Sequence, residues 1–451
     1  MTIDKDEIQN LVSVETGEVD RRIFVDQDIF DREMREIFGR AWLFLCHESQ
    51  IPKKGDFFEA PMGRDNVLVV RQKDGSIRAM INSCTHRGNS VCRAEEGNTK
   101  NFMCTYHGWT FGLGGDLIGV PGLEKFYNNE LDLPKLGLRQ VAQLDTYKGF
   151  VFATFDATAP SLLDYLGNTG KLGIDLIAEM GDMKIVPGVG KFVIDCNWKL
   201  TVDNLFDWYH PQITHMSATA ADILPEDLFD AFLDAATDGG GARTPEGAEI
   251  KFAGTDLFDF LESIAILGEY GHAIAGPPDG RTRPTSQWRT RPEAAEVLGP
   301  IGVRVGGHPN IFPTMWITMG GQVCLRVPRT PTRTEIWWYN FVPQDAPEDI
   351  KQRMIELQNH IFGPAGILEQ EDGENWVQGT MQAAGDQAST IPQVLKMNLG
   401  RGKIIHEGGL ARIEGPTNEH GQLWTYHAWA QWMSGCPWDV LAERTTPGVS
   451  I

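Results

Sequence analysis

The chain has 451 residues, which is long enough for two domains or one large domain with a substantial core. Its formal net charge of -21 at pH 7 argues against nucleic acid or an anionic membrane surface as a partner. No apolar run reaches the length of a membrane span, and Met1–Asn10 is acidic rather than a basic segment before an apolar core. We therefore expect a cytoplasmic protein.

The seven cysteines fit a reducing compartment. Cys84 and Cys104 each lie close to a histidine, which suggests a metal centre. The other five are scattered and odd in number, so we expect reduced packing residues at Cys46, Cys92, Cys196, Cys324 and Cys436.

The first forty residues predict an arm followed by a helix. Residues 1–25 are expected to form the arm, and Asp26 is a suitable N-cap for the helix. The apolar residues after it fall on one helical face: Phe30, Met34, Ile37 and Phe38.

Short strands are expected from about residue 43. Asn66–Arg71 and Ser76–Asn82 flank Lys73-Asp74-Gly75, which is a hairpin signal, and Gly149–Phe155 is a strongly apolar strand. Residues 40–156 therefore predict a small all-β domain.

A change of composition near residues 157–166 predicts a domain boundary. Residues 217–300 contain Gly239-Gly240-Gly241 and Gly276-Pro277-Pro278, so we expect long loops there. Regular structure is expected elsewhere in this half: strands at Phe192–Ile194, Ile311–Met319, Gln322–Val327 and Thr334–Phe341, and helices at Trp198–Tyr209, Pro347–Ile361 and about 365–383.

Two Cys-His pairs provide the first candidate metal site. Cys84 and His86 precede Cys104 and His107 in the spacing C-x-H-x17-C-x2-H. Two thiolates and two imidazoles fit a two-iron, two-sulfide cluster with one iron held by sulfur and the other by nitrogen. A structural zinc site accepts the same donors, but zinc patterns more often group the cysteines before the histidines. The interleaved order favours the iron–sulfur cluster.

A second candidate site begins with His210 and His215. On an ideal helix, residues five apart lie about 140° from each other, so the two imidazoles converge only if the helix ends or distorts, and Pro211 makes a regular continuation difficult. Asp207 is three residues before His210, where it can orient the imidazole. Taken alone, the pair is as consistent with packing or capping as with metal binding.

The acidic run from Glu369 to Glu374 offers a third ligand, although such a run is more often a solvated helix face. Two histidines and one carboxylate on iron(II) leave positions open for dioxygen. The Cys-His motif, the D-x-x-H-x4-H motif and the late acidic segment together resemble the large subunit of Rieske non-haem iron ring-hydroxylating dioxygenases of the naphthalene, biphenyl and phenylpropionate type.

This resemblance covers nearly the whole chain and implies an α+β fold. It implies a small all-β Rieske domain at residues 40–156 and a larger helix-grip-type catalytic domain with an antiparallel sheet at residues 157–451. The arm and helix of residues 1–39 are expected to pack with the catalytic domain. The implied cofactors are one [2Fe-2S] Rieske cluster and one mononuclear Fe(II) per chain.

The resemblance also implies roles for individual residues. Cys84, His86, Cys104 and His107 match the cluster ligands. His210, His215 and Asp372 match the iron ligands, with Glu371 and Glu369 as weaker candidates for the acid. Asp207 matches the aspartate that links the two metal centres, accepting hydrogen bonds from His210 and from His107 of a neighbouring subunit. Asn204 matches a polar residue near the iron, although it lies one residue closer to the first histidine than in naphthalene-type enzymes.

The implied reaction is cis-dihydroxylation of an aromatic ring. No G-x-G-x-x-G fingerprint follows an expected strand, so electrons are expected from a separate NADH-dependent reductase, through a ferredoxin. A trimer, with or without a small β subunit, is expected. The substrate is a neutral hydrocarbon such as biphenyl or naphthalene by preference, or an aromatic acid. Residues expected to line its pocket are Phe206, Met216, His308, Asn310 and Phe362.

Three other functions stay open from the sequence. The nearest is a Rieske monooxygenase or demethylase acting on an aromatic substrate. A second is a Rieske electron-transfer protein without catalytic iron. A third is a binding protein stabilised by zinc.

Overall fold

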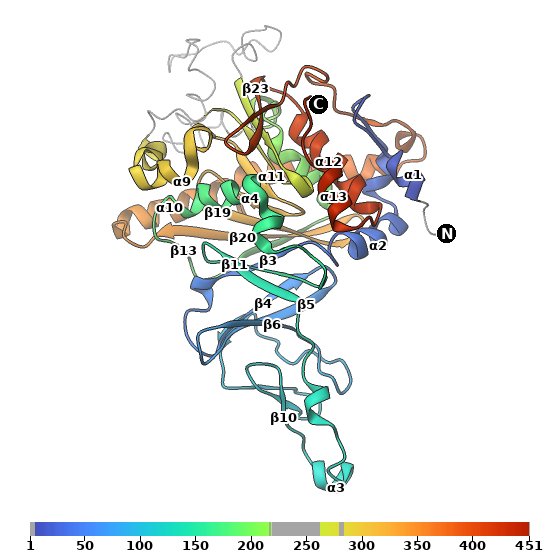
Figure 1. Cartoon of the computed structure of the whole chain (residues 1–451), viewed down its shortest axis with the longest axis vertical. Coiled ribbons are helices and arrows are strands. Elements are labelled where there is room, and N and C mark those ends of the chain that lie inside the picture. Colours follow the sequence, from blue (N-terminus) through green and yellow to red (C-terminus); the bar gives the residue numbers. More distant parts are fainter. Residues whose placement is uncertain (1–4, 216–217, 219–261, 279–283, 451) are drawn as a thin grey trace. The chain divides into compact units, whose positions relative to one another are not determined.

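The computed structural model describes residues 5–215, 218, 262–278 and 284–450 (Figure 1). The chain divides into two compact units, of which the first comprises Met1–Glu33 with Leu163–Ile451 and the second comprises Met34–Leu162. The second unit, Met34–Leu162, contains all of residues 40–156, the range expected for the small all-β domain. The first 33 residues belong with the larger unit.

The smaller unit consists mainly of antiparallel strands in three small sheets. One sheet has the order β6-β5-β4-β7, another β10-β9-β8 and the third β11-β12-β3. The strands are β3 (Leu43–His47), β4 (Asp56–Met62), β5 (Asp65–Arg71), β6 (Ile77–Ile81), β7 (Glu96–Asn98), β8 (Phe102–Met103), β9 (Thr110–Phe111), β10 (Leu117–Gly119), β11 (Gln143–Tyr147) and β12 (Phe150–Thr154). Short helical segments are η2 (Glu48–Gln50), α3 (Leu123–Tyr127) and η3 (Leu133–Leu136).

The expected hairpin in this unit is confirmed. Strands β5 and β6 pair antiparallel with Val67 opposite Ile81 and Arg71 opposite Ile77. Gly75 between them has φ +87°, a conformation that glycine adopts without strain. The core beneath the sheets also contains both Cys84 and Cys104, which are almost fully buried.

The larger unit is built on an antiparallel sheet that has ten strands among the described residues. Its order is β13-β20-β19-β18-β17-β16-β15-β23-β22, and β14 also pairs with β20. The strands are β13 (Met183–Ile185), β14 (Gly190–Ile194), β15 (Glu262–Leu267), β16 (Ala273–Gly276), β17 (His308–Ile311), β18 (Met315–Ile317), β19 (Gln322–Thr330), β20 (Arg333–Pro343), β22 (Ile405–Glu407) and β23 (Leu410–Pro416). A small separate sheet contains β1 (Val12–Ser13), β2 (Glu18–Val19) and β21 (Gln393–Val394).

Helices pack against this large sheet. Helix α12 contacts β15 and β16, α10 contacts β20, and α5 contacts β19; α1 lies beside α12 in Figure 1. The helices are α1 (Lys5–Gln9), α4 (Leu162–Ala178), α5 (Trp198–Asp203), α6 (Pro211–Thr214), α9 (Pro292–Gly302), α10 (Glu348–Ile361), α11 (Ile367–Ala383), α12 (His420–Met433) and α13 (Trp438–Arg444). Short 3-10 helices are η1 (Arg21–Phe24), η4 (Asn204–Phe206), η6 (Glu269–Gly271), η7 (Pro284–Thr290) and η8 (Ala388–Thr390).

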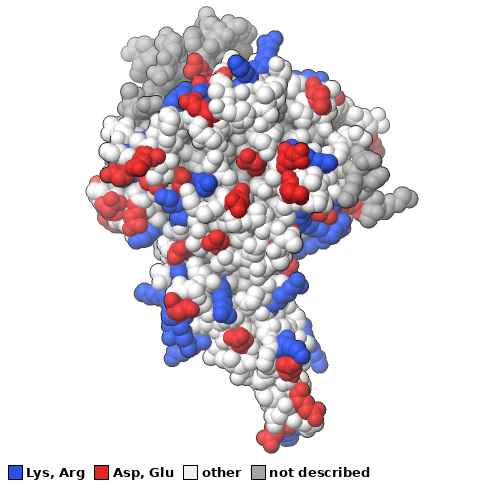
Figure 2. Space-filling model, in the orientation of Figure 1, with Lys and Arg blue, Asp and Glu red and all other residues white. Residues whose placement is uncertain are grey.

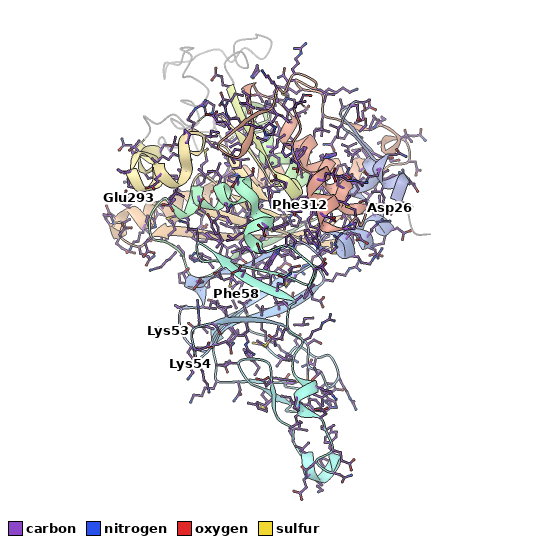
Figure 3. The ribbon with its side chains drawn as sticks, in the orientation of Figure 1. Asp26, Lys53, Lys54, Phe58, Glu293 and Phe312 are labelled. Atoms are coloured by element: carbon purple, nitrogen blue, oxygen red, sulfur yellow. The ribbon has the colours of Figure 1, made fainter. Side chains whose placement is uncertain are left out.

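The early helix is also confirmed. Helix α2 (Gln27–Glu36) follows Asp26, which Figure 3 labels, and the Asp26 carboxylate accepts hydrogen bonds from the backbone N–H groups of Asp28 and Ile29 at 2.7 and 3.1 Å. This is the N-cap interaction that the sequence predicts.

The prediction of long loops over residues 217–300 is wrong in part. β15 and β16 are central strands of the large sheet, and α9 occupies residues 292–302. Residues 239–241 lie outside the described residues. The Gly-Pro-Pro run at 276–278 suggested a continuous irregular region, but it only ends β16.

Among the described residues, no helix is both long and apolar enough to cross a membrane. Lys and Arg side chains are interspersed with Asp and Glu on the face in Figure 2. On that face, the described side chains do not gather the net negative charge into one patch.

Candidate metal centres

Two similar loops carry the Cys-His pairs of the smaller unit. In each loop the cysteine carbonyl accepts a hydrogen bond from a glycine four residues on, Gly88 at 2.8 Å and Gly108 at 2.9 Å. Both glycines have positive φ, +74° and +72°, which lets each loop turn back on itself. The cysteine N–H groups close the loops by donating to the carbonyls of Asn89 and Trp109.

The loops bring the four predicted donors together. The rings of His86 and His107 lie 4.5 Å apart, and the indole of Trp109 stacks on His86 at 4.7 Å. Cys84 and Cys104 are close enough for their thiols to interact. The Nδ1 atom of His86 is buried and lacks a hydrogen-bond partner, as a nitrogen that binds a metal would.

The surroundings of the two sulfur atoms also fit metal-bound thiolates. Burial raises the pKa of Cys104, but backbone N–H groups of Tyr106 and His107 and the Asn89 amide outweigh burial and lower it. The Asn89 amide lies 3.6 Å from the Cys104 sulfur. Burial raises the pKa of Cys84, opposed by N–H groups of its own loop. N–H donors to sulfur are a typical means of tuning an iron–sulfur cluster.

In the larger unit, the two predicted histidines flank a very short helix. α5 ends at Asp203, and Pro211 is the first residue of α6 rather than an interruption of a longer helix. His210 therefore precedes α6 and His215 follows it, with their rings 5.2 Å apart. Proline suits the first turn of a helix because the N–H it lacks would have no partner there. This local fold is what lets histidines five apart converge.

The acid comes from α11, about 160 residues along the chain. Asp372 Oδ1 lies 3.3 Å from His210 Nε2 and 3.4 Å from His215 Nε2. Among the described residues, His210, His215 and Asp372 are the group whose ligand atoms all lie within 4.8 Å of one another. Asp372 Oδ1 is buried without a hydrogen-bond partner. These three residues fit a two-histidine, one-carboxylate iron site.

The electrostatics of this group favour a bound cation. Burial lowers the pKa of His210, but the carboxylates of Asp207 and Asp372 outweigh burial and raise it to about 10. Asp207 Oδ2 lies 3.6 Å from His210 Nδ1, and its Oδ1 accepts hydrogen bonds from the N–H groups of Tyr209 and His210. The proton on His210 therefore occupies a place that suits a metal ion equally well.

Glu371 and Glu369, the weaker candidates for the acidic iron ligand, do not lie between the two histidines as Asp372 does. Glu371 Oε2 lies 2.9 Å from His215 Nδ1, the ring nitrogen that faces away from Asp372. Glu369 is buried, and neither carboxylate oxygen has a hydrogen-bond partner. Asp372 is thus the acid that the geometry brings to both histidines.

The remaining predicted residues are spread around this group. Asn204 begins the single turn η4, and Phe206 in that turn packs near Gly421 of α12. The Asn310 amide lies 3.5 Å from the carbonyl of Pro313. His308 and Phe362 both contact Trp316, each with ring centroids 5.1 Å apart. Met216 lies outside the described residues.

Asp203, a second carboxyl beside Asp207, was not among the residues predicted from the sequence. Asp203 Oδ2 accepts hydrogen bonds from Gln393 at 2.8 Å and Tyr426 at 3.0 Å. Loss of hydration, reinforced by the charge of Asp207, raises the pKa of Asp203 to about 7. The signal was present in the sequence, because Asp203 and Asp207 are four residues apart, a spacing that places two side chains on the same face of a helix.

Comparison with known sequences decides the family. A model of the Rieske [2Fe-2S] domain matches residues 41–147, and a model of the ring hydroxylating alpha subunit catalytic domain matches residues 175–434. The chain belongs to the Rieske-type ring-hydroxylating alpha subunits. It therefore carries a Rieske [2Fe-2S] cluster and a mononuclear iron. This excludes two of the functions left open by the sequence, a zinc-stabilised binding protein and an electron-transfer protein without catalytic iron.

Individual alpha subunits match over most of their length. Biphenyl 2,3-dioxygenase subunit alpha of Rhodococcus jostii is 35% identical, over 98% of this chain and 95% of the relative. The large oxygenase component of the naphthalene 1,2-dioxygenase system of Pseudomonas aeruginosa is 36% identical, over 81% of this chain and 80% of the relative. These relatives are dioxygenases that act on aromatic rings.

Solved alpha-subunit structures share the fold. Naphthalene 1,2-dioxygenase with indole bound in the active site superposes with a TM-score of 0.81 at 30% identity, covering 96% of each chain. A quaternary ammonium Rieske monooxygenase has a TM-score of 0.68 at 16% identity and shows the fold alone. The expected α+β fold, with an all-β Rieske domain and a larger catalytic domain, is confirmed.

Proposed function

We propose that this alpha subunit is the terminal oxygenase that adds both atoms of O2 to an aromatic ring and forms a cis-dihydrodiol. The observation that supports it most is the convergence of His210, His215 and Asp372 in a chain that also has the Rieske loops. The arene takes up one O2, two electrons and two protons, so that two hydroxyl groups end on adjacent ring carbons. When bound, the mononuclear iron supplies oxygen activation and the Rieske cluster supplies electrons one at a time.

The residues around the iron ligands hold them in position. His215 donates from Nδ1 to Glu371, which leaves Nε2 with its lone pair directed towards Asp372. Asp207 Oδ2 lies 3.6 Å from His210 Nδ1, which is an ion-pair contact and not a hydrogen bond. The Nε2 atoms of both imidazoles face Asp372 Oδ1, as ligands of one shared metal ion would.

We propose the same route for electron delivery that the resemblance implies. Cys84, His86, Cys104 and His107 hold the cluster, and Asp207 accepts a hydrogen bond from His107 of a neighbouring subunit in a trimer. Support comes from the partial exposure of Asp207, whose side chain keeps a third of its surface open. A ferredoxin, an NADH-dependent reductase and a small β subunit are the proposed partners.

The experiment that tests this function uses the purified chain with a ferredoxin, an NADH-dependent reductase and 18O2. The substrates are biphenyl, naphthalene, toluene and the corresponding carboxylic acids. We expect a cis-dihydrodiol in which both new oxygen atoms carry the label, and no product when the reductase is omitted. Product with a single labelled oxygen, or formaldehyde from a methoxyarene, would instead identify a monooxygenase or demethylase.

A further inference from the structure

An arginine lies in the interior of the larger unit without a hydrogen-bond partner. Arg326 is in the middle of β19, inside the apolar run Val323–Val327, and it is 0% exposed. All three nitrogens of its guanidinium group are buried and make no hydrogen bond in the described part of the chain. Arginine has five N–H donors and keeps its charge at any ordinary pH.

An arginine in this state is energetically unfavourable in the free protein. A charge removed from water needs both an opposite charge and hydrogen-bond partners to offset the lost hydration. The guanidinium carbon lies 4.4 Å from the centre of the Trp316 ring, so a cation–π contact offsets part of this cost. That contact satisfies none of the N–H donors.

The titratable groups that face Arg326 do not neutralise it. They are His308, Cys196, Cys324 and Glu369. Burial, together with the charges of Arg326 and His210, lowers the pKa of His308 to about 3, so this ring is neutral. Burial raises the pKa of Cys324. Burial also raises the pKa of Glu369 to about 8, and no oxygen of Glu369 bonds to the guanidinium group.

Trp316 and Trp338 lie 4.4 and 5.9 Å from the guanidinium carbon and belong to a larger cluster of aromatic rings. Neighbouring ring centroids are 5.1 Å apart for Trp208 and His308, His308 and Trp316, Trp316 and Trp338, and Trp316 and Phe362, and 5.2 Å for Trp338 and Phe362. We call these five residues the aromatic cluster. Rings at this spacing pack directly against one another, and the outer faces of the cluster are apolar surface against which an aromatic ring can pack.

The aromatic cluster is close to the iron ligands. His308 is near enough to His210 for the charge of His210 to act on it. Glu369, which faces Arg326, lies three residues before Asp372 in α11 and on the same helical face. A cation with free donors, aromatic faces and the iron site therefore occur in one region of the larger unit.

We propose that Arg326 binds a carboxylate or other oxyanion carried by the aromatic substrate, with the substrate ring packed against the aromatic cluster. This inference rests on the proposed function and specifies its substrate class. The planar fork of donors in arginine matches a carboxylate with two parallel hydrogen bonds. Of the two substrate classes considered from the sequence, aromatic acids are thereby favoured over neutral hydrocarbons.

The test compares matched acids and neutral arenes on the purified protein and on two variants. Benzoate, 2-naphthoate and biphenyl-4-carboxylate are paired with toluene, naphthalene and biphenyl. Arg326→Met removes the charge at similar length. Arg329→Met is the control, because Arg329 lies on the same strand but pairs with Glu335 at the surface. Ligand binding is read from the shift of the thermal midpoint, and turnover from the yield of dihydrodiol.

We expect at least one acid to raise the midpoint of the parent protein and to be turned over with a kcat/KM ten-fold or more above that of its neutral partner. Arg326→Met should lose that shift and at least a hundred-fold of kcat/KM on the acid, with less than a three-fold change on the neutral arene. Arg329→Met should behave as the parent. Since Arg326→Met removes an unpaired buried charge, its own midpoint should not fall.

Results that overturn the inference differ from those that overturn the proposed function. If neutral arenes are turned over while no acid binds, Arg326 does not select the substrate, although the dioxygenase assignment stands. If Arg326→Met loses stability and turnover equally for both classes, the arginine has a structural role only. If no arene is turned over but acids still shift the midpoint through Arg326, the proposed function fails and the binding site remains.

Discussion

At the scale of single residues, the iron site depends on side chains that do not bind iron. Glu371 accepts from His215 Nδ1 at 2.9 Å and so determines which ring nitrogen carries the proton. Asp372 follows Glu371 in the same helix, so two consecutive carboxylates have different roles: Asp372 is the proposed iron ligand and Glu371 orients His215. The acidic run predicted that one of these residues is a metal ligand. Which carboxylate faces the Nε2 atoms of the histidines and which one accepts from His215 Nδ1 depends on the side of α11 that each occupies.

We expect Glu371→Ala to weaken iron binding about 10- to 100-fold, because the imidazole of His215 loses its orienting acceptor. Iron content after dialysis against a graded chelator measures this affinity. Glu374→Ala is the control, since Glu374 is exposed on the same helix and its carboxylate accepts only from Gln378 in the described structure. Equal iron retention by the two variants would remove Glu371 from the site.

At the scale of elements, one buried carboxylate joins three helices of the larger unit. Glu33 of α2 is 0% exposed and accepts from Lys199 Nζ at 2.6 Å and Trp198 Nε1 at 2.9 Å, both at the start of α5. It also accepts from Trp429 Nε1 of α12 at 2.7 Å. Because α5 leads directly to the iron ligands, this contact fixes the segment that carries them.

Glu33→Gln should destabilise the larger unit by about 3–5 kcal/mol, because it leaves the buried ammonium of Lys199 without an opposite charge. The free energy of unfolding in urea measures the loss. Adding Lys199→Met should restore most of the stability. Glu36→Gln at the end of the same helix breaks only a partly exposed pair with Arg40 and should cost less than about 1 kcal/mol. A similar cost for both single variants would contradict this role for Glu33.

Elements that are determined by interactions between residues close in the sequence are predicted correctly, whereas elements that depend on distant partners are not. The β5–β6 hairpin and the N-cap of α2 are set by residues within a few positions, and both are confirmed. β15 and β16 gain their order from pairing with β23 and β17, which are far away in the sequence. The apolar run of β15 is short, and the glycine and proline residues that follow it indicate a loop. The local sequence therefore did not predict a strand there.

At the scale of the whole molecule, the sequence predicts which residues come together at the proposed iron site, but not what surrounds them. The motifs that supply His210, His215 and Asp372 are recognisable because metal binding restricts both residue type and spacing. The burial of Arg326 and Asp203 arises only when the sheet and the helices pack, so a single sequence does not reveal it. The available hints were an arginine inside an apolar strand and the four-residue spacing of Asp203 and Asp207.

Each unit has a buried hydrophobic cluster of its own, and this gives a last prediction, about iron removal. In the absence of iron, the carboxylates of Asp207 and Asp372 raise the pKa of His210 to about 10 and keep its ring protonated, whereas a bound ion stabilises the folded unit by an amount that grows with its affinity. At an ion concentration of about 100 times Kd, this stabilisation is about 2.7 kcal/mol. Chelation of the mononuclear iron should therefore lower the thermal midpoint of the larger unit, followed by tryptophan fluorescence.

The visible absorption of the Rieske cluster should persist to an unchanged temperature in the same experiment. Its ligands lie on loops of the smaller unit, whose core contains Cys84 and Cys104 but none of the residues of the iron site. Asp372→Ala is the control, because a chain that cannot hold the ion should show no further change on chelation. If the cluster absorption were lost at the lower temperature together with the fluorescence change, the two units would unfold as one.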